Sequence, residues 1–457
     1  MDFIYSLAVV LLIFEGIIIQ CECAPRRNRN AQANDLPFLP REIIELIVSK
    51  TDYKTIKEAI KSFLVQPNDI VMSRILQNNL MVICPDLDED IHEYQNEDGS
   101  VLRFSNYEGI SSFFDKFGDK VKRMAVEIYS KRNDDPTINF APNIIKKYAN
   151  NLEELRIAGF TDIRFWEGLS DGEIDIIFPE VKKFEFWGWS NQSILKINLM
   201  FPKLESLKLI GTVADGNCLK NVKGLKKLML HTSSIQENQL DDIFANNKNI
   251  TMIYLTAPNR TETMGSIAKH LMKLKTLAVD CPGKTFLLRT NNGPVYTLPS
   301  VNHFVIKYRR TNEVFGIGNP SYDMPHLKEL TFEANEINER IVEFIEQFNG
   351  LEVLELSLTN YNAVECIGKF KHIIEFRTST YRKRFPDLQI FFKTFDEESK
   401  LQTVKLLDFR ETKFKKYENA MKEFNIELKY SKKPTWTLAK GDQIGTFLTY
   451  VMFKRDP

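Results

Sequence analysis

The sequence has little cysteine and no excess of charge of either sign. Six cysteines occur in 457 residues, and the four beyond position 23 (Cys84, Cys218, Cys281 and Cys366) lie far apart and form no Cys-x-x-Cys pair. Such spacing excludes a recognisable disulfide framework or cysteine metal site. Basic and acidic residues both number 61, so no overall field attracts nucleic acid or anionic lipid. A partner must therefore be recognised by local features.

Sequence motifs for catalysis are also missing. The segment Gly316-Ile317-Gly318 lacks the third glycine of a dinucleotide loop, and a doubly wound sheet would also need longer apolar strands. No His-Glu-x-x-His motif or nucleophile elbow is present. We therefore expect no enzyme, no cofactor and no metal site. The histidines are scattered singly along the chain: His92, His231, His270, His303, His326 and His372.

Residues 1–23 have the pattern of a secretory signal peptide. An apolar stretch precedes Cys21 and Cys23, which are small residues at positions −3 and −1 of a cleavage site. The alternative is an uncleaved anchor, but Glu15 interrupts the run of about 20 apolar residues that a spanning helix requires. We expect a secreted chain with no membrane association after cleavage, beginning with a flexible linker at 24–35. The glycosylation sequons are Asn191, Asn249 and Asn259.

The strongest pattern in the sequence is a repeated unit, apolar-x-x-apolar-x-apolar. It occurs twelve times within residues 121–430, at intervals of 21 to 31 residues, and helix-like stretches such as 240–244 and 341–348 lie between units. The first, fourth and sixth residues are expected to point inward from a short strand that the following segment covers. The units begin at Val121, Leu152, Val181, Leu204, Leu225, Ile250, Leu274, Val301, Leu327, Leu351, Ile373 and Leu401.

This pattern resembles the leucine-rich repeat. The resemblance implies an α/β solenoid, a curved horseshoe of about twelve strand-plus-helix repeats. Residues 431–457, which include Trp436, are expected to form a C-terminal cap. Twelve strands about 4.8 Å apart would give an inner face on the order of 55 Å long, which suits a folded protein or a long peptide.

A partner would meet the third, fifth and seventh residues of each unit, because these lie opposite the inward residues. Trp187 and Trp189 flank Gly188, and an exposed tryptophan pair is typical of a protein-binding hot spot; the alternative is that one ring covers a neighbouring repeat. The candidate binding residues are Lys183, Glu185, Trp187, Trp189, Lys208, Ile210, Met229, His231, Met252, Tyr254, His303, Val305, Lys307, Glu329, Thr331, Glu333, Glu355, Arg377 and Lys405.

Residues 36–76 have helical periodicity and precede a connecting segment at 77–120. Their start, Leu39-Pro40-Arg41-Glu42-Ile43-Ile44, resembles the F-box motif. That resemblance implies docking on a Skp-type adaptor of a cullin-RING ubiquitin ligase while the repeats hold a target protein. The alternative is a helical cap for the solenoid. The residues implied in docking are Leu36, Pro37, Leu39, Pro40, Ile43, Ile44, Ile47, Ile56, Ile60 and Phe63.

An F-box, leucine-rich repeats and a signal peptide in one chain resemble the secreted salivary effectors that plant-feeding insects deliver into host cells. The resemblance implies a substrate-recognition adaptor that acts in the host cytoplasm on an unidentified target protein. Two alternatives stay open. One is a secreted leucine-rich-repeat binding module with no ligase role. The other is an intracellular F-box protein whose hydrophobic start is not a signal peptide.

Overall fold

The structure is a computed structural model, and it describes part of the chain. The residues that it describes are 76, 80–83, 101–104, 107–128, 136–159, 163–169, 176–189, 197–212, 216–231, 235–256, 261–281, 295–308, 322–334, 339–358, 369–379, 399–410, 418, 419, 421, 422, 425, 428, 435–440, 443–444 and 447–455.

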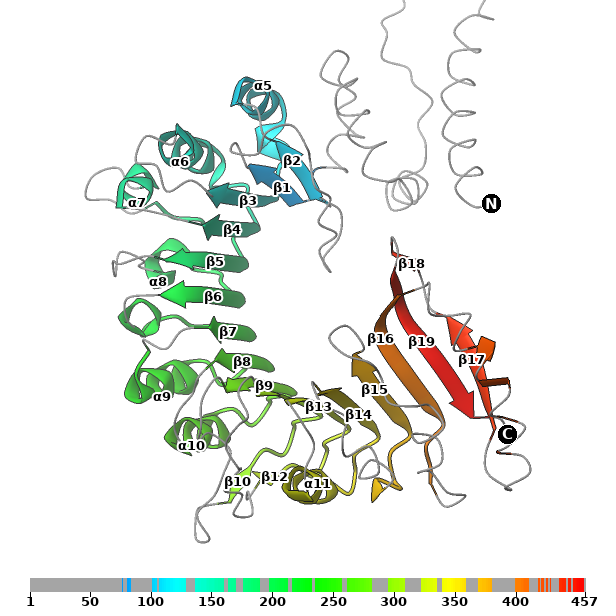
Figure 1. Cartoon of the computed structure of the whole chain (residues 1–457). Helices are drawn as coiled ribbons and strands as arrows, with labels where there is room; N and C mark the ends of the chain where they lie inside the picture. Colours follow the sequence, from blue (N-terminus) through cyan, green and yellow to red (C-terminus); the bar gives the residue numbers. More distant parts are fainter. Residues whose placement is uncertain are drawn as a thin grey trace, which may run out of the picture. The chain divides into compact units, whose positions relative to one another are not determined.

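The chain divides into two compact units. The first comprises Met1–Trp189 and Leu199–Lys203, and the second comprises Ser190–Asn198 and Leu204–Pro457. Both contain α-helices and a mostly parallel β-sheet (Figure 1). The fold class is therefore α/β with many parallel strands, an arrangement compatible with a solenoid.

In the first unit the described strands form one parallel sheet. The spatial order is β2-β1-β3-β4-β5, so the first two strands are exchanged relative to their order in the chain. The strands are β1 (Leu80–Ile83), β2 (Val101–Phe104), β3 (Arg123–Ile128), β4 (Glu154–Gly159) and β5 (Lys183–Trp189).

In the second unit the described strands from β6 to β16 pair in parallel in chain order, except that β10 and β12 form a separate two-stranded sheet. The strands are β6 (Ser206–Thr212), β7 (Lys227–His231), β8 (Met252–Thr256), β9 (Thr276–Cys281), β10 (Tyr296–Thr297), β11 (His303–Tyr308), β12 (Tyr322–Asp323), β13 (Glu329–Ala334), β14 (Val353–Leu358), β15 (Glu375–Ser379) and β16 (Thr403–Arg410).

The parallel series changes direction after β16. Strand β19 (Phe447–Arg455) pairs antiparallel with β16, and β17 (Trp436–Lys440) and β18 (Gln443–Ile444) pair antiparallel with β19. Trp436 is 2% exposed. The segment expected to be a cap thus contributes three strands that follow the last repeated strand.

Helices pack against the side of the strands that carries the core. In the second unit, α9 (Glu237–Asn246) and α10 (Thr261–His270) lie on the same side of β7 to β9 (Figure 1). Phe344 of α11 (Glu339–Glu346) contacts Phe332 of β13 with ring centroids 6.3 Å apart. The remaining described helices are α5 (Tyr107–Phe117), η1 (Gly118–Lys120), α6 (Pro136–Tyr148), α7 (Ile163–Leu169), α8 (Ile197–Met200) and η2 (Gly216–Leu219).

The twelve units found in the sequence coincide with twelve of the described strands. In each of these twelve sequence repeats the first, fourth and sixth residues are buried, each at most 3% exposed. The prediction of which repeat residues form the core is therefore confirmed. The physical reason is the two-residue period of a strand, which places the fourth and sixth residues on one face.

The units also repeat their backbone hydrogen bonds. The N–H groups of Lys226 and Lys227 both donate to the carbonyl oxygen of Glu205, at 2.7 and 3.0 Å, and those of Thr251 and Met252 donate to that of Lys226, at 2.8 and 3.3 Å. The same paired donation recurs between successive strands from β3 to β5 in the first unit and along the main sheet from β6 to β16 in the second. A tight turn, in which the first residue of the unit donates to the carbonyl three residues earlier, precedes Val121, Val181, Ile250, Leu274, Val301, Leu327, Leu351 and Ile373.

Candidate functional site

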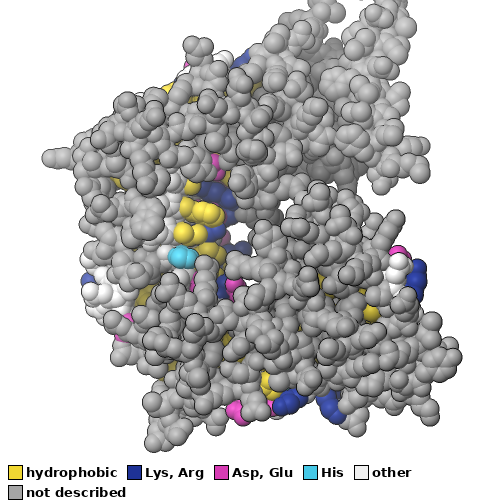
Figure 2. Space-filling view, viewed as in Figure 1, with side chains coloured by type: hydrophobic (Ala, Val, Ile, Leu, Met, Phe, Trp, Pro, Cys, Tyr) yellow, Lys and Arg dark blue, Asp and Glu magenta, His cyan; other side chains and the backbone are white. Residues whose placement is uncertain are grey.

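The candidate site is the face of the strands opposite the core. This face, called the exposed face below, consists of the third, fifth and seventh residues of the twelve sequence repeats. Parallel pairing in register aligns equivalent residues into rows that cross the strands, and the space-filling view shows hydrophobic side chains beside Lys and Arg side chains, with a histidine nearby (Figure 2). In the second unit the row of fifth residues is Lys208, Met229, Tyr254, Ala278, Val305, Thr331, Glu355, Arg377 and Lys405.

In the first unit this face carries a compact ion network centred on Glu154. Its carboxylate lies 2.7 Å from Nε of Arg123, 2.5 Å from Nε of Arg156 and 3.3 Å from Nζ of Lys183. Glu185 lies 3.1 Å from Lys183 and 3.8 Å from Arg156. Burial acts to raise the pKa of Glu154, but Arg156, Arg123 and Lys183 outweigh it, so its pKa lies below the ordinary value. The network holds the Glu154 carboxylate ionised although the residue is only 5% exposed, and Glu185 beside it is equally buried.

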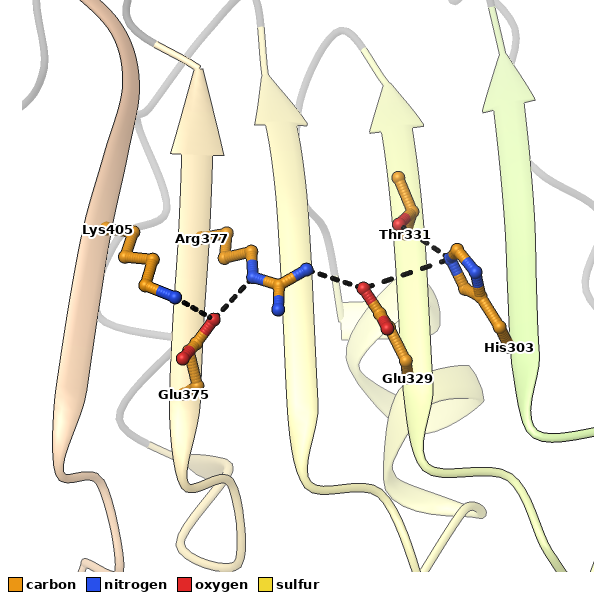
Figure 3. A network of polar contacts seen from close by, with 6 residues as sticks. All are labelled: His303, Glu329, Thr331, Glu375, Arg377 and Lys405. Carbon is orange, nitrogen blue, oxygen red and sulfur yellow. Dashed lines mark hydrogen bonds and ion pairs between the residues drawn. The ribbon is translucent and has the colours of Figure 1, made fainter. Parts of the chain in front are cut away.

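In the second unit a longer network crosses β13 to β16 (Figure 3). Arg377 donates from Nε to Glu375, at 2.5 Å, and from Nη1 to Glu329, at 2.6 Å. Strand β14 lies between these two carboxylates, and its residue paired with both of them is the apolar Val353. Lys405 donates to Glu375 at 3.0 Å. Burial raises the pKa of Glu375, and the hydrogen bonds from Arg377 and Lys405 more than reverse this, leaving the pKa below its usual value.

His303 forms the end of this network on β11. Its Nε2 lies 3.3 Å from the hydroxyl of Thr331 and 4.0 Å from the carboxylate of Glu329 (Figure 3). Burial lowers the pKa of His303 below 6.5, and the opposing effect of Glu329 does not overcome it. At neutral pH the imidazole is therefore mainly uncharged, and it adds little positive charge to the face.

A third group of contacts joins β8, β9 and β11. The hydroxyl of Tyr254 lies 3.1 Å from Oδ2 of Asp280, and Nζ of Lys307 lies 6.0 Å from the centroid of the Tyr254 ring. Asp280 and Lys307 are also paired in register. These contacts hold the phenol ring, half-buried, at a defined place on the exposed face.

Most of the binding residues expected from the sequence lie on this face and are half-buried. Trp187 is the most exposed of those described, at 43%. Glu185 differs from the expectation, because its ion pairs with Arg156 and Lys183 enclose it and leave it 5% exposed. The half-buried members are Lys183, Lys208, Ile210, Met229, His231, Met252, Tyr254, His303, Val305, Lys307, Glu329, Thr331, Glu333, Glu355, Arg377 and Lys405.

Several residues of the networks were missed by the sequence analysis. Arg123, Glu154 and Arg156 hold the first network, and Asp280 and Glu375 belong to the second unit. The signal was present in the sequence, because all five residues stand at the third, fifth or seventh position of one of the twelve repeats. Reading those positions in every unit would have included them.

Other expectations lie outside the described residues. These are the signal peptide (1–23), the linker (24–35), the F-box-like residues Leu36 to Phe63, the side chain of Trp189, and the sequons at Asn191 and Asn259. The third sequon residue, Asn249, is exposed, and its side-chain oxygen accepts a hydrogen bond from Lys273 at 2.9 Å.

Comparison with protein-family models and with curated proteins finds no match to this chain. Within the described part of the chain, no three His, Cys, Asp or Glu side chains are grouped closely enough to hold a metal ion. None of the helices in that part is both long and apolar enough to cross a bilayer.

Proposed function

We propose that this protein is a non-catalytic binding protein of the leucine-rich-repeat type, and that its exposed face takes a partner protein. The observation that carries the proposal is the alignment of side chains, most of them half-buried, into rows across successive parallel strands. Such rows mix apolar, aromatic and charged groups over a distance that spans many strands. A surface of this length and variety suits a polypeptide better than a small metabolite, which is usually held in a concave pocket.

Photo-crosslinking from single positions tests this proposal. A crosslinking amino acid would be placed at Met229 or Glu333 on the exposed face and, as a control, at Met272, which is 53% exposed beyond α10. We expect one and the same protein to be crosslinked from the first two positions and not from Met272. Equal crosslinking of that protein from Met272 would contradict the assignment of the binding face.

The finer proposal is that the protein is the substrate-recognition adaptor of a cullin-RING ubiquitin ligase. Residues 36–76 would dock a Skp-type adaptor while the exposed face binds the target. Delivery as a secreted effector would place this activity in host cells. The support comes from the sequence, namely the F-box resemblance at Leu39-Pro40-Arg41-Glu42-Ile43-Ile44 and the signal-peptide pattern of residues 1–23.

Purified protein mixed with a Skp-type adaptor tests this role. We expect co-elution by gel filtration, and its loss when Leu39, Pro40 and Ile43 are changed to alanine. Co-elution together with an absence of N-glycans at Asn249 would favour an adaptor acting in a host cytoplasm. No co-elution by the intact protein would leave the alternative of a secreted binding module without a ligase role.

A further inference from the structure

The exposed face of the second unit contains an uninterrupted apolar strip. The strip consists of four half-buried side chains, Met229, Met252, Tyr254 and Val305, on β7, β8 and β11. Ala278 of β9, which is only 4% exposed, lies between Tyr254 and Val305 and continues the strip without a polar group. Pairing in register brings Met229 beside Tyr254, Tyr254 beside Ala278, and Ala278 beside Val305. With adjacent strands about 4.8 Å apart, the strip runs about 15 Å across the sheet. It is long enough to contact two or three apolar side chains of one segment.

Lysines border one end of the apolar strip. Lys208 of β6 is paired with Met229, and Lys227 of β7 is paired with Met252. Lys227 is exposed and Lys208 is half-buried. A segment that lies along the strip therefore meets positive charge at this end.

Carboxylates predominate at the other end. Beyond Val305 the row continues with Thr331 and Glu355, and Glu329 follows His303 in the row of third residues. Four carboxylates and two cations stand on this part of the face, and the neutral imidazole of His303 does not alter the balance. The residues are Glu329, Glu333, Glu355, Glu375, Arg377 and Lys405.

Lys307 of β11 lies close to both the apolar strip and the carboxylates. Its positive charge does not change which charge predominates beyond Val305. Lys307 is paired in register with Asp280 on one side and with Glu333 on the other. Glu333 is already among the four carboxylates counted above, so adding Lys307 and Asp280 gives five carboxylates and three cations. The order of charge along the face is positive, apolar, then negative.

We propose that this face binds a polypeptide segment whose side chains run acidic, apolar and basic along its length. The segment lies across the strands, with acidic groups over Lys208 and Lys227, apolar groups on the strip, and basic groups over Glu329 and Glu355. From β6 to β14 the distance is about 29 Å, which corresponds to about 9 residues of extended chain or about 19 residues of helix. This inference rests on the proposed function and adds the chemistry of the partner.

Selection of peptides from a random phage-displayed library on the full-length protein tests the inference directly. We expect the selected sequences to share acidic residues, then aliphatic or aromatic residues, then basic residues, or the reverse order read along the chain. A fluorescein-labelled peptide of this kind would then be titrated and followed by fluorescence anisotropy. Met229→Lys should weaken binding at least about 10-fold, because a buried apolar contact worth more than about 1.4 kcal/mol is lost.

Two controls make this result specific. Met272→Lys introduces the same change at an exposed position of the same unit, and we expect it to leave the affinity unchanged. Lys227→Glu should weaken the same peptide, and a peptide whose acidic residues are replaced by lysine should recover binding to that variant. Circular dichroism melting curves of all variants would establish that each one folds.

The possible outcomes distinguish the inference from the proposed function. Selected peptides without the charge order, or with equal affinity for Met229→Lys, overturn the inference. A second result also overturns the inference, namely peptides that bind Met229→Lys and Lys227→Glu normally and lose binding only to Glu355→Lys. In that case the exposed face would still be a binding surface, so the proposed function would stand. Peptides that are insensitive to all three changes count against both proposals.

Discussion

Asn247 is a buried asparagine that joins two repeats, and its replacement by alanine is a sharp test of the structure. Its side-chain oxygen accepts a hydrogen bond from the N–H of Leu225 at 3.0 Å. Its amide nitrogen donates to the carbonyl oxygens of Val222 at 2.8 Å and of Ile243 at 2.9 Å. The residue is 2% exposed, so no water can replace these partners without a local rearrangement.

The expected cost of Asn247→Ala follows from these three hydrogen bonds. Each buried hydrogen bond contributes about 1 kcal/mol net, and each partner left unsatisfied costs about 1–3 kcal/mol. We therefore expect a loss of about 3–5 kcal/mol in local stability. The neighbouring Asn246 makes a single exposed bond, from its side chain to the carbonyl of Lys220 at 3.0 Å, so Asn246→Ala should cost under about 1 kcal/mol.

Amide hydrogen exchange measured by mass spectrometry is the appropriate assay, because the two units need not unfold together. Peptides that cover 216–231 and 235–256 should lose protection in Asn247→Ala and keep it in Asn246→Ala. Peptides from β3 to β5 in the first unit should be unchanged in both. If the two variants lose the same protection, the joining role assigned to Asn247 is wrong.

Three further predictions concern the backbone, the ion network and the core. Gly159 has a φ of +105°, and an added Cβ would lie 1.8 Å from the carbonyl oxygen of Ile128; Gly159→Ala should therefore cost about 4 kcal/mol or more in urea unfolding. Gly224→Ala is its control, because φ is +87° there but the nearest atom to the added Cβ is 3.7 Å away, and it should cost about 1–2 kcal/mol. The pKa of Glu154 is lowered by folding, so its contribution to stability is fully present above the unfolded value near 4.3 and is lost as the pH falls through the folded value. Urea titrations at several pH values should show a loss of stability at acidic pH in the wild type and a smaller loss in Glu154→Gln. Equal losses of stability would contradict the lowered pKa of Glu154. Phe244 is fully buried in α9. Phe244→Ala should therefore lower stability by about 3–5 kcal/mol, measured as faster hydrogen exchange in β7 and β8.

The repeated core could be predicted because its signal is local. Within each unit the apolar residues stand at fixed spacing, and a strand converts that spacing into a single buried face. Strands β1 and β2 were not expected, because Leu80–Ile83 is four consecutive buried residues without the repeated unit. The pairing of β1 with β3 and of β2 with β1 joins segments about 20 to 40 residues apart, which no local pattern reveals.

The exposed face could be predicted as a set of positions, but its contacts could not. Arg377 bonds Glu329, 48 residues earlier, and does so past the intervening strand β14. Glu185 was expected to be open to a partner and is enclosed by Arg156 and Lys183. Which charges meet depends on side-chain length and on strand register, since equivalent positions lie 21 to 31 residues apart in the chain.

The sequence by itself determined the number of repeated strands between residues 121 and 430, the residues that they bury, and the positions that face away from the core. It could do so because burial in a short strand follows from the identity of residues within one unit. The tertiary structure alone decided the order of β1 and β2, the ion networks, and the apolar strip from Met229 to Val305. Each of these arises from side chains of different repeats brought side by side by the pairing of strands.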